Sequence, residues 1–236
     1  MAHMKRLAMP ATWPLAKKQT VWITQPLPSG HPKQYCMPIN IILRDLLKLT
    51  KTTHETKKLL VNNDVFVDGR KIKNYKEAVG LFDILEIPGT QKAYTFIITK
   101  KNLLKLIEIK QTSEKIVRIK AKKVVKGNKI QLTFHDGRNF IADNKFKVGD
   151  SVIFDFKEKK IKQHLPLSQN AIVYVIAGSN VGKVGIFKGQ VKDEKQKRKF
   201  GIVEFKDEEK KEKKVLLKNL FVIDENWEKI IEENNN

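Results

Sequence analysis

The chain has 236 residues, and its 47 Lys and Arg against 26 Asp and Glu give a net charge of +21 with histidine neutral. Hydrophobic residues make up 41% of the chain, which is enough for packed cores and excludes wholesale disorder, and the length predicts one to three domains. No apolar run reaches the ~18–20 residues of a membrane span and one cysteine cannot form an internal disulfide, so the composition favours a soluble intracellular protein with a polyanionic partner.

Residues 1–38 are predicted to form an extended basic arm that docks on another molecule. They hold six of the eight prolines, five basic side chains and no acidic one. Proline fixes φ and removes a backbone donor, so a long helix or a central strand does not fit here. Trp13 and Trp22 either stack on RNA bases or anchor the segment to the protein's own core. The predicted RNA contacts in this arm are Lys5, Arg6, Trp13, Lys17 and Lys18.

Residues 39–86 open with two predicted helices. Apolar residues recur at i, i+3, i+4 and i+7 and predict an amphipathic helix, its core face made of Ile39, Ile42, Leu43 and Leu46. A second face of the same helix is predicted to carry a basic stripe of Asn40, Arg44, Lys48 and Lys51. Thr52 and Glu55 then predict a capping box for a short helix that ends near residues 62–63.

A tight hairpin is predicted to follow these helices. Asp68 and Gly69 stand between the apolar run 65–67 and residues 70–72, and both tolerate the positive φ of a two-residue turn. Residues 81–86 are predicted to close the unit as a strand.

This helix–helix–hairpin order resembles the alpha-L RNA-binding module, whose hairpin commonly has Asn where this chain has Asp68. The resemblance implies RNA contacts, although a charged, solvated helix face remains the alternative for each of them. The implied contacts are Arg44, Lys48, Lys51, Lys57, Lys58, Arg70, Lys71 and Lys73.

Residues 87–168 are predicted to form a small β-barrel or sandwich, because short strands separated by turn residues recur every eight to twelve positions. Residues 100–170 carry eighteen basic and seven acidic side chains. Arg118, Lys120 and Lys122 alternate along one predicted strand and so share a face. This face is predicted to be a phosphate track; protection of an edge strand by lysine is the alternative.

The segment 169–224 contains Gly178, Gly182 and Gly185 between apolar runs. A phosphate-binding P-loop is excluded, because one residue is missing between the first two glycines and Val184 replaces the hydroxyl residue that binds magnesium. The spacing instead resembles the KOW motif of SH3-like barrels, which implies RNA contacts by Lys183 and Lys188. Its glycines permit close backbone approach, either to packed strands or to RNA.

The final segment, 225–236, is predicted to be a short helix capped by Asp224, followed by a polar end that frays. Residues 200–236 have a net charge of −3, whereas residues 1–199 have +24. The acidic end is therefore expected to lie away from a polyanion.

No pattern indicates catalysis or a bound metal. The five histidines are scattered, and Lys58 stands where a zinc-protease helix needs its second histidine. No nucleophile elbow is present, and Cys36 lacks the flanking residues of a catalytic thiol, so a packed thiol is favoured. The chain is therefore predicted not to be an enzyme and to need no cofactor, metal or small-molecule substrate.

The order of arm, alpha-L module, central β domain and KOW barrel resembles the archaeal and eukaryotic S4e family of small-subunit ribosomal proteins over essentially the whole chain. The blocks that carry the resemblance include the runs 3–8, 80–83, 135–138, 178–185 and 219–223. The family implies an α+β, mostly β fold with an extended N-terminal arm. It also implies a structural role in translation, with small-subunit rRNA and neighbouring ribosomal proteins as partners, and a cytoplasmic location in the small ribosomal subunit without membrane contact.

Three alternatives remain open. An RNA-modifying enzyme would need an additional catalytic domain, and a KOW-type elongation factor would need a domain that contacts polymerase. A free-standing RNA chaperone would be found outside sedimenting ribosomes.

Overall fold

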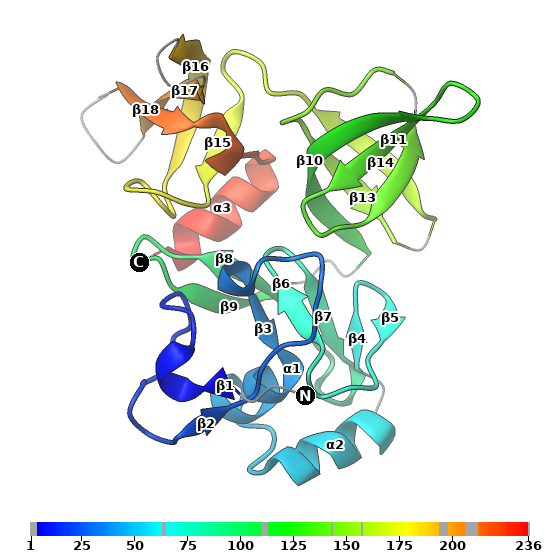
Figure 1. Ribbon diagram of the computed structural model, residues 1–236, viewed down its shortest axis with the longest axis vertical. Coiled ribbons are helices and arrows are strands. Elements are labelled where there is room, and N and C mark those ends of the chain that lie inside the picture. The colour runs from blue at the N-terminus through cyan, green and yellow to red at the C-terminus, as the bar shows by residue number, and fades with distance from the viewer. Residues whose placement is uncertain are drawn as a thin grey trace. The chain divides into compact units, whose positions relative to one another are not determined.

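The computed structural model describes residues 4–62, 65–109, 113–142, 144–156, 158–193, 198–205 and 212–235 (Figure 1). The chain folds into two compact units. The first unit comprises Met1–Ile97, Leu103–Lys115 and Phe156–Glu158, and the second comprises Ile98–Asn102, Ile116–Asp155 and Lys159–Asn236. The predicted class is confirmed, because the described residues are mostly β with a few helices.

The first unit is built on a five-stranded sheet with the strand order β5-β4-β7-β8-β9. Its strands are β4 (Phe66–Val67), β5 (Arg70–Lys71), β7 (Ile84–Ile87), β8 (Lys92–Ile98) and β9 (Leu104–Ile109). Two smaller strand pairs accompany it: β1 (Met4–Lys5) with β2 (Trp22–Ile23), and β3 (Cys36–Pro38) with β6 (Ala78–Gly80). The helical elements are η1 (Arg6–Ala8), η2 (Lys33–Tyr35), α1 (Ile39–Ile41), η3 (Ile42–Leu46), α2 (Thr53–Asn62) and η4 (Pro88–Thr90).

The N-terminal segment packs onto the first unit through two buried side chains, Trp13 and Arg6, while its docking on another molecule stays a prediction. Trp13 is 2% exposed, and its indole Nε1 donates to the carbonyl of Cys36 at 3.0 Å. Arg6 is 3% exposed and its guanidinium donates to Ala16, Gln19 and Thr20 at 2.6–3.1 Å. Acceptors within the segment itself thus satisfy the buried arginine without an acidic partner. Residues 1–3 lie outside the described part.

The first helix is shorter than predicted, so the basic stripe does not form. The α1 and η3 elements end at Leu46, and Lys48 has a φ of 54°, which reverses the chain before Lys51. Asn40 is fully buried, and its amide donates to Thr24 Oγ1 at 2.7 Å and to Thr53 Oγ1 at 3.3 Å. The apolar spacing of i, i+3, i+4 and i+7 identified the buried face of this helix correctly, but it carries no information about where the helix ends.

The second helix and the hairpin are confirmed. Thr52 Oγ1 accepts the backbone N–H of Glu55 at 3.2 Å, while the Glu55 carboxylate accepts the N–H of Lys51 at 2.7 Å and so lowers its own pKa. Asp68 and Gly69 have φ values of 51° and 71°, as a two-residue turn requires. The strand expected at 81–86 begins only at Ile84, because the backbone turns first at Phe82 with a φ of 63°.

The second unit contains two five-stranded sheets, ordered β12-β11-β10-β13-β14 and β18-β17-β16-β15-β19, and the second of them is antiparallel throughout. The first consists of β10 (Glu114–Val125), β11 (Lys129–Phe134), β12 (Asn139–Ala142), β13 (Ser151–Asp155) and β14 (Lys160–Leu165). The second consists of β15 (Ile172–Val175), β16 (Val184–Asp193), β17 (Arg198–Phe205), β18 (Glu212–Leu216) and β19 (Leu220–Val222), with η5 (Leu217–Asn219) before β19. Its buried core contains Val173, Val175, Phe187, Val203, Phe205, Val215, Leu220 and Val222.

The predicted phosphate track along β10 is interrupted. The pairing of β10 with β11 shifts register between Ile119 and Ala121, so Lys120 is the extra residue of a β-bulge. Strict alternation therefore does not hold from Arg118 to Lys122, and the prediction that all three share one face is wrong.

The C-terminal helix α3 (Glu225–Asn234) is confirmed, but the residue after it does not fray. Asn235 is 6% exposed; its side-chain oxygen accepts the backbone N–H of Lys100 at 3.2 Å, and its amide donates to the carbonyl of Gly182. Asp224 occupies the N-cap position without a side-chain capping bond. The backbone N–H of Lys100 and the carbonyl of Gly182, both in the second unit, thus share the side-chain amide of Asn235 as their partner.

Candidate nucleic-acid interface

An aromatic side chain between two lysines marks the basic surface of the first unit. The Tyr75 ring lies beneath the ammonium groups of Lys57 and Lys76, whose nitrogens are 4.8 and 5.5 Å from its centroid. Lys57 comes from α2 and Tyr75 follows the β4–β5 hairpin, so the contact joins the two predicted RNA-binding elements. We call Lys57, Tyr75 and Lys76 the Tyr75 cluster. Sequence reasoning missed Tyr75, although its position between Lys73 and Lys76 is the kind of aromatic and basic interleaving that indicates RNA contact.

Most of the predicted contact residues are exposed on their own unit. Cations at the surface can neutralise phosphates without first breaking a buried interaction. The exposed candidates are Lys5, Lys17, Lys18, Lys48, Lys51, Lys57, Lys58, Arg70, Lys71, Lys73 and Lys120. The structure brings only some of them together, and their contacts with RNA stay predictions.

Three candidates, one of them the exposed Arg70, form an ion pair with a neighbouring carboxylate. Arg44 contacts Asp45 at 2.8 Å, Arg70 contacts Glu77 at 3.0 Å, and Lys188 contacts Glu204 at 2.8 Å. Surface ion pairs of this kind are worth about 0–1 kcal/mol, so each of these cations can exchange its partner for a phosphate.

Arg6, Trp13 and Arg118 are not presented to a ligand. The Arg118 guanidinium donates to the carbonyls of Leu217 (3.0 Å) and Lys218, and burial lowers the pKa of Arg118 to about 10. The place of this arginine in the predicted phosphate track does not fit the structure, because its guanidinium already binds the backbone of η5 within the second unit. Trp22, by contrast, is 55% exposed.

The glycine-rich loop between β15 and β16 packs against the protein's own backbone. Gly182 has a φ of 78°, and a Cβ there would overlap the backbone of Thr99 and Lys100. Lys183 lies with its ammonium 5.7 Å from the centre of the Phe205 ring. Of the two alternatives for the glycines, packing is the one the structure bears out at Gly182.

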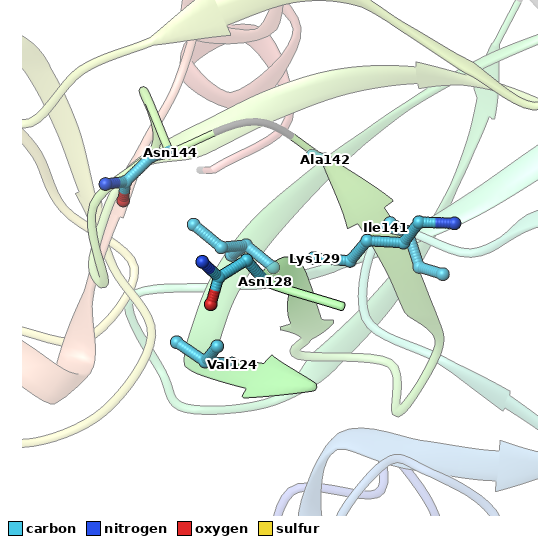
Figure 2. Close-up of a pocket in the computed structure, with 7 residues that line it drawn as sticks. Val124, Asn128, Lys129, Ile141, Ala142 and Asn144 are labelled. Carbon is cyan, nitrogen blue, oxygen red and sulfur yellow. The ribbon is translucent and has the colours of Figure 1, made fainter. Parts of the chain in front are cut away.

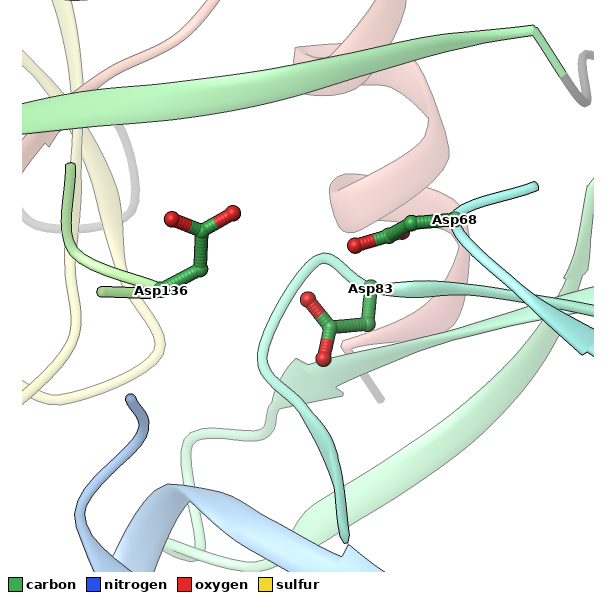
Figure 3. Close-up of side chains that lie close together, drawn as sticks. All are labelled: Asp68, Asp83 and Asp136. Atoms are coloured by element: carbon green, nitrogen blue, oxygen red, sulfur yellow. The ribbon is translucent and has the colours of Figure 1, made fainter. Parts of the chain in front are cut away.

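A buried charge cluster lies inside the first unit. The Lys115 ammonium, which is fully buried, contacts Asp68 at 2.9 Å and also contacts Asp83, whose carboxylate lies 3.1 Å from His31 Nε2. Figure 3 shows the Asp68 and Asp83 carboxylates together; Asp136, also drawn there, belongs to the second unit. Burial opposes ionisation of Asp83, but the Lys115 and His31 charges hold its pKa well below the usual range.

This charge cluster connects several strands and loops of the first unit. Asp68 also accepts the backbone N–H of Ile84 at 2.9 Å, and Asp83 accepts that of Gly80 at 2.6 Å, so both carboxylates have partners on more than one strand. Sequence reasoning assigned no role to Lys115 and so missed this cluster. Cys36 is buried as expected, and burial raises the pKa of its thiol to about 11, which leaves it unreactive at neutral pH.

Within the part of the chain that the structure describes, no helix combines the length and the apolar character needed to cross a bilayer.

Comparison with known proteins gives one consistent match. The family model described as "Ribosomal family S4e" matches residues 90–161. The small ribosomal subunit protein eS4 of Methanocella arvoryzae is 39% identical over 183 residues, which cover 78% of each chain. That of Nanoarchaeum equitans is 39% identical over 80% of this chain and 82% of its own. A crystal structure of the 30S ribosomal protein S4e from Thermoplasma acidophilum superposes with a TM-score of 0.66 at 29% identity, covering 80% of this chain and 95% of that one.

Proposed function

The chain belongs to the S4e family of ribosomal proteins, and from this premise we propose that it is a structural constituent of the small ribosomal subunit that binds rRNA during translation. The observation that carries the proposal is 39% identity to proteins named as small-subunit components over about four fifths of the chain. A net charge of +24 over residues 1–199 supports a nucleic-acid partner. In this role the protein binds rRNA within the small ribosomal subunit in the cytoplasm. Neighbouring ribosomal proteins are its other partners.

The proposed mechanism is electrostatic and depends on shape. Lysine and arginine side chains neutralise phosphates and release counterions, while surface loops follow the form of the RNA. The Tyr75 cluster adds an aromatic face flanked by two ammonium groups, suited to an unstacked base next to its phosphate.

The module assignments are part of this proposal. We assign residues 39–86 to an alpha-L module, 87–168 to a central β domain and 169–224 to a KOW-type SH3-like barrel. The helix–hairpin order supports the first assignment, and the positive φ values of Gly178 and Gly182 in the loop before β16 support the last.

A salt titration tests the electrostatic mechanism. If about 6–10 phosphates are contacted, the affinity of the full chain for small-subunit rRNA should fall by ~10³–10⁵ between 50 and 200 mM salt, on the estimate for duplexes. Filter binding at several salt concentrations measures the slope. A flat response would contradict the mechanism, and recovery of the native protein solely at the top of a sucrose gradient would contradict the ribosomal role and favour an RNA chaperone.

A double substitution of Lys71→Gln and Lys73→Gln is expected to weaken rRNA binding and to reduce the magnitude of the salt slope by about 2, since each lost phosphate contact removes about 1. Both side chains are exposed, so the folded state should be retained. Lys229→Gln is the matched control, because Lys229 is an exposed lysine on α3 in the acidic C-terminal segment. Equal slopes for the double variant and the control would remove these two lysines from the interface.

A further inference from the structure

The N-terminal segment presents an exposed indole on the first unit. Trp22 on β2 pairs directly with Lys5 on β1 (Figure 1), and the next pair along the two strands is Met4 with Ile23. Residues that stand directly opposite each other in an antiparallel pair project to the same face, and successive residues project to opposite faces. Met4 and Ile23 are each 7% exposed, whereas Trp22 is 55% exposed and Lys5 is exposed as well. The two buried side chains therefore hold this short ladder against the unit, and the lysine and the indole face outward together.

A buried arginine orders the loop that leads into this ladder. The Arg6 guanidinium donates to three acceptors within residues 16–20, at 2.6–3.1 Å. The hydroxyl of Thr20 donates in turn to the carbonyl of Trp22 at 3.1 Å. The loop is thereby fixed at both ends, and it presents two exposed lysines, Lys17 and Lys18.

These lysines belong to the same small surface as the indole. Four residues of fully extended chain span at most about 14 Å, so the backbone of Lys18 lies within that distance of Trp22. The backbone N–H of Arg6 also donates to the carbonyl of Val21 at 2.9 Å, which ties the start of the segment to the end of the loop. We call Lys5, Lys17, Lys18 and Trp22 the Trp22 platform.

The charge of the platform selects its partner. Residues 1–38 hold five basic side chains and no acidic one. Lysine is depleted in protein–protein interfaces, yet here a lysine stands directly opposite the exposed indole. Surfaces that bind single-stranded nucleic acid instead combine cations along the backbone with aromatic side chains on which bases stack. The platform therefore suits a polyanion that carries planar apolar faces.

A cavity on β10, β11 and β12 of the second unit lacks such an arrangement (Figure 2). Val124 pairs with Ile130 on β11, whereas Ile141 pairs with Gln131, one position further along that strand. Successive residues of a strand point to opposite faces, so the exposed side chains of Val124 and Ile141 do not form one apolar wall. The Trp22 platform has its aromatic ring and its nearest cation on one face.

We propose that Trp22 stacks on an unpaired base of small-subunit rRNA, with the adjoining phosphates bound by Lys5, Lys17 and Lys18. The inference rests on the proposed binding of rRNA and names one contact within it. Trp13 does not share this role, since it is 2% exposed and its indole N–H already donates to Cys36.

The first test compares two substitutions of Trp22 in the full chain by filter binding to small-subunit rRNA. Trp22→Phe keeps an aromatic face and is expected to bind close to the wild type. Trp22→Leu keeps an exposed apolar side chain without that face, and it is expected to weaken binding about 5- to 150-fold, the effect of removing one aromatic that stacks on a base. Thermal unfolding of both variants should match the wild type, because the indole is more than half exposed.

The second test observes the indole itself. The chain has three tryptophans, so the emission of Trp22 is the difference between the wild type and Trp22→Phe. Small-subunit rRNA is expected to quench this difference, because a base stacked on indole quenches its fluorescence. The double substitution Lys17→Gln and Lys18→Gln, which leaves the indole in place, should raise the rRNA concentration needed for half of the quenching. Lys229→Gln is the matched control and should leave that concentration unchanged.

The outcomes separate this contact from the proposed function. If the wild type binds rRNA, then equal affinities of Trp22→Leu and Trp22→Phe, or an unchanged Trp22 emission at saturating rRNA, would overturn the stacking proposal and leave the proposed function standing. If the wild type does not bind rRNA, the proposed function fails and the stacking proposal fails with it. A photoreactive side chain at position 22 that crosslinks to a protein in assembled subunits, and never to RNA, would also overturn the stacking proposal.

Discussion

Replacing Lys115 with methionine is expected to lower the free energy of unfolding by about 3–5 kcal/mol at pH 7. The substitution keeps the length and apolar stem of the side chain and removes its charge. Asp68 and Asp83, which are 7% and 4% exposed, would then face each other with no ammonium between them. Denaturant titration of the full chain, followed by circular dichroism, measures the loss.

The pH dependence of this loss separates charge from packing. In the wild type the pKa of Asp83 is depressed, so its contribution is complete above its unfolded value near 3.9 and is lost only as pH falls through the lower folded value. In the variant, buried carboxylates without a cation have raised pKa values, and acidification neutralises them while the protein is still folded. The difference between wild type and variant should therefore shrink from pH 7 towards pH 4.

Lys92→Met is the matched control, because Lys92 contacts Glu108 at 2.9 Å in an exposed ion pair of the same unit. Its stability should equal that of the wild type within experimental error. A Lys115→Met loss that stays constant from pH 7 to pH 4 would show that packing rather than charge is responsible.

Gly182→Ala is expected to cost about 2–5 kcal/mol in the second unit. The left-handed conformation at a φ of 78° costs an L-residue about 1–2 kcal/mol, and forcing a methyl group against packed backbone costs about 1–3 kcal/mol more. A Cβ at this position would lie 2.5 Å from the carbonyl carbon of Thr99. The backbone N–H of Gly182 also donates to Val175 at 2.8 Å, so the loop cannot move away without losing that bond.

Gly178→Ala isolates the conformational part of this cost. Gly178 also has positive φ, 103°, but a Cβ there would meet its nearest neighbour, Asn219 Nδ2, at an ordinary 3.7 Å. Thermal unfolding should rank the wild type above Gly178→Ala, and Gly178→Ala above Gly182→Ala. Equal midpoints for the two variants would mean that the contact with Thr99 and Lys100 contributes nothing.

Local sequence patterns predicted the elements whose causes are local. The Asp68–Gly69 turn and the Thr52 cap both depend on residues within a few positions of one another, and the structure bears them out. The end of the first helix and the bulge at Lys120 were not predicted, since tertiary packing and strand register decide them.

The candidate interface shows the same division. Sequence reasoning identified most of the exposed lysines correctly, because an isolated lysine is normally solvated. It could not show that Arg6 and Arg118 donate to backbone carbonyls 10 and 99 residues away, or that Lys115 pairs with two aspartates across 47 and 32 residues. Long-range pairing of this kind leaves no mark in the spacing of one sequence.

Asp68 performs two tasks that have different chemical requirements. The hairpin turn accepts Asn, Asp or Gly at this position, whereas neutralising Lys115 requires a carboxylate. Substitutions at position 68 are therefore constrained by Lys115, which lies on a strand 47 residues further along the chain. Among diverging descendants of this gene, residues 68, 83 and 115 should change together or not at all. The neighbouring Gly69 should be constrained only by the positive φ that the turn requires.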